Sequence, residues 1–392
     1  MRVSASSPTI ALLLLVFTLV CGLPESPWIA SARAQAIPKS LEQGGSDEMQ
    51  RYRKNNWTVG IAGGQLSGTY MTFANELAEV LDDGDNLRVI PIVTYGAASN
   101  LDDLLYLRQV DLAVTQSDVF EYFRTQRKIS NLPYRVHYIV RLPVSEVHIL
   151  ARAEIKNMED LRGLKVSFGP AGSASSLTGT IVFQRLGIEV DPVLVDNSTA
   201  LQKLKSGELA ALVRVIGKPI DFFAKMPANS DLHFLPIPFS EKFADYYAVS
   251  ALTHSEYPGL VPEGEPVETL GVPAVLAVFN WPNGSDRQRR VARFTEAFFS
   301  NWEKFREPSR HPKWRDVNLA ATVPGWTRSS LAEEMLRRIR EKEGATQQAN
   351  VEEFSTFLKA KGSLFADLPR AQRETIFREF LQWQKQRPNS QR

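Results

Sequence analysis

Short apolar runs alternate with segments of helical spacing through much of the chain. The first such pair is an apolar run at Thr58–Ala62, followed over residues 70–81 by apolar residues three and four positions apart, as in a helix. Further strands are expected at residues 87–93, 111–115, 137–141, 146–151, 165–168, 193–196 and 209–215. Strands that alternate with helices in this way predict an α/β fold with largely parallel sheets.

Three of the predicted strand-to-helix connections consist mostly of small and hydroxyl residues. They are Gly63–Thr69, Tyr95–Asn100 and Gly169–Ser175. In open α/β sheets, ligands bind beyond the carboxyl ends of the strands, and backbone N–H groups at a helix N-terminus favour an anion. Each loop alone is also explained by a turn that needs glycine. Together the three loops predict one shared anion site.

The N-terminal residues have the pattern of a secretory signal peptide. Arg2 precedes the apolar run Ile10–Val20, and Ala32-Arg33-Ala34 forms a cleavage motif that would leave Gln35 first. The run is shorter than the roughly 20 residues that span a bilayer. A lipid anchor at Cys21 is the alternative, but lipid-modification signals need a small residue where this chain has valine. The sequence therefore predicts export to the periplasm.

Composition excludes several classes of function. The chain has 392 residues and a net charge of +2, which gives no electrostatic footprint for nucleic acid. Cys21 is the only cysteine, so the mature chain would have neither a disulfide nor a thiolate metal site. The sequence contains neither H-E-x-x-H nor G-x-S-x-G. We therefore expect no catalytic residue, no metal and no cofactor, and we expect His148 to be packed or hydrogen-bonded.

Four motifs occur in a fixed order along the chain. They are AGGQLSGTY at Ala62–Tyr70, GAASNL at Gly96–Leu101, DLAVTQSDV at Asp111–Val119 and DLRGLKVSFGPAGS at Asp160–Ser173. In these motifs and their spacing, the chain resembles the TAXI family of solute receptors, which serve TRAP-type secondary transporters. The resemblance covers about residues 57–300.

This resemblance implies a two-lobed, periplasmic-binding-protein-like α/β fold with a ligand cleft between the lobes. The lobes would close on a small organic acid, and the closed form would dock on a membrane permease. We expect the chain to cross between lobes near Val140–Val144 and Ala251–Tyr257. The expected organisation is a signal peptide at 1–34, a linker at 35–56, lobe 1 at 57–142, lobe 2 at 143–250, a return to lobe 1 at 251–301 and a C-terminal helical extension at 302–392.

The expected ligand is a carboxylate or an amino-acid-like anion held by neutral donors. The candidate ligand-binding residues from the four motifs are Ser67, Thr69, Tyr70, Asn100, Gln116, Gly172, Ser173 and Ser175. Asp118 would accept a ligand ammonium or hold its loop, and Ser117-Asp118 would cap a helix.

One further candidate departs from the pattern of the family. Arg214 stands where relatives often have an aromatic residue that faces the cleft. Its guanidinium would bind a ligand carboxylate through two parallel hydrogen bonds. The alternative is a structural arginine, in an ion pair or with its side chain reaching the surface.

The C-terminal extension is expected to be helical. Leu331, Met335 and Ile339 lie four residues apart, and Asn350 with Glu353 resembles a capping box. Another helix is expected from Asp367 and Pro369 through Phe377, Phe380, Leu381 and Trp383. Such amphipathic stripes favour packing on the outside of a lobe. A platform for a binding partner is the alternative.

Two functions stay open at this point. The first is a monomeric receptor that delivers its ligand to a TRAP-type permease. The second is a periplasmic sensor or adaptor that uses the same cleft to signal to a membrane partner.

Overall fold

The computed structural model describes residues 46–360 except Asp85, Asn229 and Ser230, together with Pro369, Gln372, residues 374–378 and Phe380. The predicted signal peptide lies outside the described residues, as do Asp367, Leu381 and Trp383 of the last predicted helix. None of the helices in the described part of the chain is long and apolar enough to cross a membrane.

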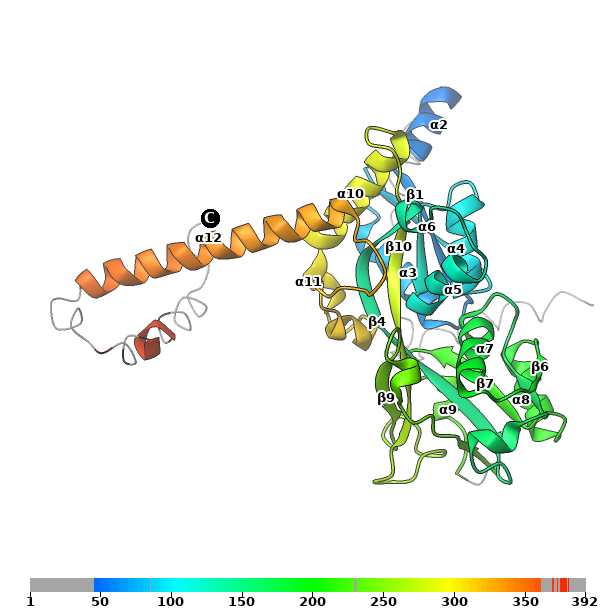
Figure 1. Ribbon diagram of the computed structural model, residues 1–392. Coiled ribbons are helices and arrows are strands. Elements are labelled where there is room, and N and C mark those ends of the chain that lie inside the picture. The colour runs from blue at the N-terminus through cyan, green and yellow to red at the C-terminus, as the bar shows by residue number, and fades with distance from the viewer. Residues whose placement is uncertain are drawn as a thin grey trace, which may run out of the picture. The chain divides into compact units, whose positions relative to one another are not determined.

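Ten strands form one mixed sheet (Figure 1). The long strands β4 (Val136–Arg152) and β10 (Val267–Phe279) run antiparallel to each other in its middle. Beyond β10 follow β3 (Leu112–Gln116), β1 (Thr58–Gly64) and β2 (Arg88–Val93). Beyond β4 follow β7 (Ala211–Ile216), β5 (Lys165–Ser167) and β6 (Asp191–Val193), while β8 (Leu232–Phe234) pairs with β4 and β9 (Ala248–Leu252) pairs with β10.

The helices pack on the strands that they follow or precede. The helices at the end of the sheet that holds β1, β2 and β3 are α2 (Asp47–Asn56), α3 (Thr69–Leu81), α4 (Ala97–Tyr106), α5 (Ser117–Thr125), α6 (Leu132–Arg135), α10 (Asp286–Ser300) and α11 (Trp302–Phe305). The helices at the end that holds β5, β6 and β7 are α7 (Ala174–Leu186), α8 (Asn197–Lys205) and α9 (Asp221–Ala224). The 3₁₀ turns are η1 (Met158–Leu161), η2 (Glu241–Phe243) and η3 (Pro312–Asp316), and the last described long helix is α12 (Ser330–Ala360).

Two lobes share the long strands β4 and β10. Lobe 1 holds β1, β2 and β3, and lobe 2 holds β5 to β9. Between the lobes the register shifts, because Pro273 pairs with Val144 and Ala274 pairs with Leu142, which leaves Pro143 as an extra residue in β4. Proline cannot donate a ladder hydrogen bond, so both strands are weakened at the crossing. The predicted α/β, two-lobed architecture is therefore confirmed. The expectation of largely parallel sheets is wrong, because the shared strands β4 and β10 run antiparallel to each other and to the strands that they pair with.

The long strands correct two expectations. Residues 137–141 and 146–151 were expected as separate strands, but they form the single strand β4 because it serves both lobes. The second crossing lies in β10 and not at Ala251–Tyr257. Leu252 and Tyr257 are buried in an apolar cluster of lobe 2, together with Phe223 and Phe234.

The C-terminal region begins inside the core of lobe 1. Phe305 and Trp314 are fully buried, and the ring of Trp314 lies 4.7 Å from that of Phe73 in α3. The predicted helix start at Asn350 is wrong, because α12 runs from Ser330 to Ala360 without interruption. Helical sequence on both sides lets an existing helix propagate through a potential cap.

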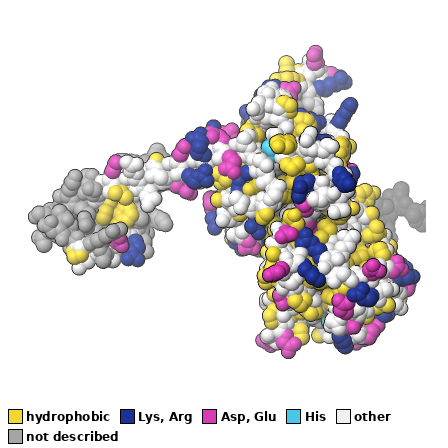
Figure 2. Space-filling model, viewed as in Figure 1, with side chains coloured by type: hydrophobic (Ala, Val, Ile, Leu, Met, Phe, Trp, Pro, Cys, Tyr) yellow, Lys and Arg dark blue, Asp and Glu magenta, His cyan; other side chains and the backbone are white. Residues whose placement is uncertain are grey.

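On the face of the molecule shown in Figure 2, Lys and Arg side chains intermingle with Asp and Glu side chains.

Candidate functional site

A small pocket lies between the two lobes. Its described lining comes from the loops after β1 and β2 in lobe 1, and from β7 and the first residues of α7 and α8 in lobe 2. The lining residues are Gly63, Gly64, Gln65, Gly68, Thr69, Tyr70, Tyr95, Gly96, Ala97, Ser173, Ala174, Ser175, Asn197, Arg214, Val215 and Ile216. The cavity volume is about 50 Å³. In this arrangement of the lobes, the pocket suits a compact ligand.

Four helices begin at the pocket. Thr69, Ala97, Ala174 and Asn197 are the first residues of α3, α4, α7 and α8, and all four line it. Because α3 and α4 start after glycine, neither has a side-chain cap on its first N–H groups. Free N–H groups and the positive ends of helix dipoles both attract an anion.

Gly96 lets the lobes approach each other closely at this place. Its φ is 130°, and a Cβ atom there would lie 3.1 Å from the Cα of Ser173 in the other lobe. A larger residue would therefore strain the backbone and push the lobes apart.

Arg214 is a buried cation that lines the pocket. It is only 5% exposed, and its guanidinium carbon lies 4.6 Å from the centre of the Phe222 ring. Among the described residues, no carboxylate lies within ion-pair distance of it. Burial lowers the pKa of Arg214 to about 10, so the side chain stays charged at neutral pH. The predicted alternatives, an ion pair or a side chain that reaches the surface, do not describe it.

Arg328 shows how this protein satisfies a buried structural arginine. It is 8% exposed. Its guanidinium donates to the carbonyl oxygens of Leu319 at 2.9 Å, Ala320 at 3.0 Å and Ala321 at 2.7 Å, and pairs with Glu333 at 3.0 Å. Arg214 lacks such a set of acceptors in the described part of the chain.

Three hydroxyls in the lining are fixed by hydrogen bonds from the protein. Ser145 Oγ donates to Tyr70 Oη at 3.0 Å, the Val215 N–H donates to Ser175 Oγ at 2.9 Å, and the Ser176 N–H donates to Ser173 Oγ at 3.1 Å. Burial raises the pKa of Tyr70, so its phenol stays neutral. Of the predicted site residues, the pocket thus gathers Thr69, Tyr70, Ser173, Ser175 and Arg214.

The other predicted residues lie outside the lining. Asn100 is buried and holds its loop, since its amide donates to Val114 O at 2.7 Å and accepts from Thr94. Gln116 is fully buried at the end of β3, and its amide has no hydrogen-bond partner in the described structure. Gly172 accepts from the N–H of Ser99 at 3.1 Å. Ser67 is exposed.

Sequence reasoning missed a polar bridge across the pocket. Asn197 Nδ2 donates to Gln65 Oε1 at 3.3 Å, and Gln65 Nε2 donates to Tyr95 O at 3.1 Å. Asn197 begins the helix that follows β6. The rule that ligands bind beyond the carboxyl ends of strands would have singled it out.

Asp118 joins the two lobes. Its Oδ2 accepts from Thr178 Oγ1 at 2.7 Å and from Tyr247 Oη at 3.2 Å, both in lobe 2. Burial raises its pKa. The predicted cap was wrong, because Gln116 is the N-cap of α5 and Ser117 Oγ donates to Tyr246 O at 3.3 Å.

His148 is packed and hydrogen-bonded, as expected. Its Nε2 lies 2.9 Å from Tyr257 Oη, and burial lowers its pKa to about 3. The imidazole is therefore neutral at physiological pH.

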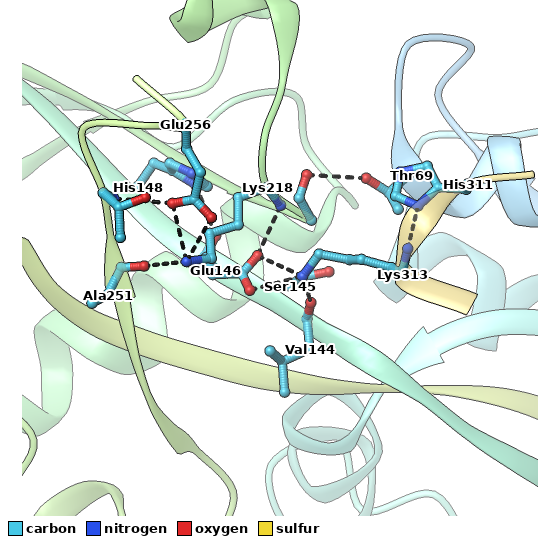
Figure 3. A network of polar contacts seen from close by, with 12 residues as sticks. Thr69, Val144, Ser145, Glu146, His148, Lys218, Ala251, Glu256, His311 and Lys313 are labelled. Atoms are coloured by element: carbon cyan, nitrogen blue, oxygen red, sulfur yellow. Dashed lines mark hydrogen bonds and ion pairs between the residues drawn. The ribbon is translucent and has the colours of Figure 1, made fainter. Parts of the chain in front are cut away.

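A buried ion pair lies close to the pocket (Figure 3). Thr69 Oγ1 donates to Gly217 O at 3.4 Å, and the N–H of the next residue, Lys218, donates to Glu146 at 2.9 Å. Lys313 Nζ lies 2.8 Å from Glu146 Oε1 and donates to Val144 O at 2.8 Å. Burial raises the pKa of Glu146, and Lys313 opposes that shift. The network thus connects the crossing strand β4 to the segment after α11.

Within the described residues, no group of three or more His, Cys, Asp or Glu side chains is arranged to hold a metal ion.

The sequence pattern of the NMT1-like family matches residues 61–325, well over half of the chain. Three solved structures show a distant likeness. The periplasmic binding protein BugD has 13% identity and a TM-score of 0.41, over 75% of this chain and 98% of its own. A TctC solute-binding protein from Polaromonas has 14% identity and a TM-score of 0.38, over 74% of this chain and 98% of its own. YhfZ from Shigella flexneri has 15% identity and a TM-score of 0.40, over 65% of this chain and 93% of its own.

Proposed function

The chain belongs to the NMT1-like family, and we propose that it is a periplasmic receptor that captures a small organic anion by closure of its two lobes. One observation carries the proposal: a buried guanidinium without an acidic partner among the described residues lines a pocket between the lobes. An unpaired buried charge is costly, and a bound carboxylate would neutralise it through paired hydrogen bonds.

The second support is the set of helix N-termini. Those of α3 and α4 come from lobe 1 and those of α7 and α8 from lobe 2, so an anion between them would contact both lobes. A ligand that contacts both lobes stabilises the closed form over the open form. The proposed contacts are Thr69, Tyr70, Ser173, Ser175 and Arg214, with Asn197 added from the structure.

We further propose delivery of the ligand to a TRAP-type membrane permease. The support is the resemblance of four ordered motifs to TAXI receptors. Signalling to a membrane partner as a sensor is the second candidate. A permease gene beside the gene for this protein favours delivery, and a kinase gene there favours signalling.

Arg214 gives the direct test. A panel of small carboxylates that includes pyruvate, succinate and glutamate is screened by thermal shift, and the tightest is titrated by calorimetry. Arg214→Leu should weaken binding about ten- to a hundredfold, since a hydrogen-bonded charge contributes roughly 1.5–3 kcal/mol. The affinity of Arg214→Lys should lie between those of the wild type and Arg214→Leu, because lysine keeps the positive charge but cannot form the two parallel hydrogen bonds of a guanidinium.

Arg108→Leu is the matched control, because Arg108 is exposed and does not line the pocket. A folded Arg214→Leu protein with wild-type affinity would refute the anchor. Mass spectrometry of what the purified wild-type protein carries from the cell would identify the natural ligand, and a cationic ligand would refute the proposed function.

A further inference from the structure

Three hydroxyl groups of the pocket share one hydrogen-bond arrangement, whereas the lining residue Thr69 donates its own proton to Gly217 O. Tyr70, Ser173 and Ser175 each accept a hydrogen bond from another group of the protein. A hydroxyl has one proton and two lone pairs. The bond that each accepts occupies a lone pair and leaves its own proton for a further acceptor. Each of the three hydroxyls therefore keeps a proton that it can donate to a ligand.

The charges of the pocket have one sign. Arg214 is the only charged side chain among the described lining residues, which include neither Asp nor Glu. Asp196 precedes the lining residue Asn197, but its carboxylate accepts from Ser198 and Thr199 at the start of α8. Asp118 is outside the lining and binds Thr178 and Tyr247.

The amide groups of the lining offer no balancing charge. Gln65 Oε1 already accepts from Asn197, and Asn197 contributes only a neutral amide oxygen. A ligand ammonium would lose its water in this pocket without gaining a carboxylate, which is costly. It would also lie beside Arg214 and the positive ends of helices, which repel it.

We propose that this pocket selects organic anions without an ammonium group, such as 2-oxo carboxylates, over the corresponding amino acids. The inference rests on the proposed function and narrows its ligand class, since the sequence left amino-acid-like ligands open. Specificity here arises from the mismatch with the wrong ligand as well as from contacts to the right one.

Two matched pairs of probes test the selectivity. Pyruvate is compared with alanine, and 2-oxoglutarate with glutamate, by calorimetry of the exported protein at neutral pH. We expect at least one 2-oxo acid to bind roughly tenfold or more tightly than its amino acid. An amino acid that binds as tightly as, or more tightly than, its partner in each pair would overturn this inference and leave the proposed function standing. If none of the four bound, this inference would fall, and the proposed function would be decided by the carboxylate panel and by the ligand carried from the cell.

A charge change at Ser173 tests the cause. Ser173 is the N-cap of α7, and Asp and Asn are equally good caps. Ser173→Asp and Ser173→Asn therefore differ in charge while both retain the cap. The Asp variant should lower the ratio of 2-oxo-acid to amino-acid affinity roughly tenfold relative to the Asn variant. Equal ratios in two folded variants would show that charge in the pocket does not set the selectivity, and the inference would be abandoned.

Discussion

At the scale of single residues, buried titratable groups have two different roles in this protein. His148 is enclosed by aromatic rings in lobe 2, where Phe223 and Tyr257 contact it, and its ring nitrogens meet protein partners. Arg214 in β7 lies directly opposite His148 in β4. Unlike His148, it lines the pocket, and it lacks an acidic partner among the described residues. His148, whose hydrogen bonds are made within the protein, supports the fold. Arg214, which has no acidic partner there, is the proposed ligand anchor.

The lowered pKa of His148 predicts a loss of stability in acid. Because the folded pKa of about 3 lies below the unfolded value, the native state binds fewer protons between these values. Stability is therefore lost as pH falls through that window, by up to about 1.4 kcal/mol per pH unit. Urea unfolding of the wild type should show an extra loss of about 2 kcal/mol between pH 6.5 and pH 5, which His148→Gln lacks.

The comparison uses the pH slope, so an overall loss of stability in the variant does not affect it. The other histidines are present in both proteins and cancel. Equal slopes for wild type and variant would mean that His148 does not titrate in this range.

At the scale of elements, α3 connects the pocket to the C-terminal region. Its first residue, Thr69, lines the pocket. Two turns later, Glu76 accepts from the His311 N–H at 2.8 Å and from Trp314 Nε1 at 2.5 Å. Lys313, which lies between His311 and Trp314 in the sequence, forms an ion pair with Glu146 in β4. The segment around η3 is therefore part of the core of lobe 1, whereas the expected extension would have been peripheral.

The Lys313–Glu146 pair should stabilise the fold strongly. Both side chains are buried, at 10% and 2% exposure. Lys313→Met leaves Glu146 unpaired in the interior and should cost about 3–5 kcal/mol in the free energy of unfolding. The double variant Lys313→Met/Glu146→Gln should recover part of this loss, because no buried charge stays unpaired. Urea unfolding measures each value.

Lys225→Met serves as the control. Lys225 pairs with Asp221 on the surface, where both side chains are largely exposed, so only a small effect is expected. If Lys313→Met were as mild as this control, the buried pair would not hold the η3 segment to β4.

At the scale of the whole described molecule, hydrogen bonds join the two lobes. Thr69 meets Gly217, Ser99 meets Gly172, and Asp118 accepts from Thr178. These bonds join lobe 1 to lobe 2, and the cavity between them is small. In the proposed function, these contacts form as the lobes close on the ligand. The bulge at Pro143, opposite Pro273, is where the shared strands are weakest.

Ligand binding should therefore shorten the distance between the lobes. Leu66 in lobe 1 and Leu194 in lobe 2 are 75% and 53% exposed. Spin labels are attached to cysteines introduced by Leu66→Cys and Leu194→Cys. Cys21 is the only cysteine of the natural chain, so Cys21→Ser ensures that only these two positions are labelled. Pulsed dipolar spectroscopy with the tightest carboxylate probe should show a shorter and narrower distance distribution. The same distribution with and without that probe would indicate a rigid protein and contradict a closing receptor.

The sequence by itself determined the elements. Alternating apolar periods located β1, α3 and β5, and Gly187 ends α7 with a φ of 74°, a conformation that glycine adopts readily. The strand β2 contains Pro91 and lies at the edge of the sheet, where a strand tolerates proline. These features depend on neighbours within a few residues, so local pattern is sufficient to specify them. Residues from all three loops that the sequence singled out are in the lining of the pocket.

Only the tertiary structure decided which side chains of those loops line the pocket. Asn100 and Thr69 both come from predicted loops, yet one is bonded to β3 and the other lies in the lining. The pairing of Lys313 with Glu146 spans 167 residues, and no local period encodes a contact at that separation. The same holds for β4, which reads as two strands but is one, because both lobes pair along it. Burial and partners depend on residues distant in sequence, and these are set only when the lobes pack.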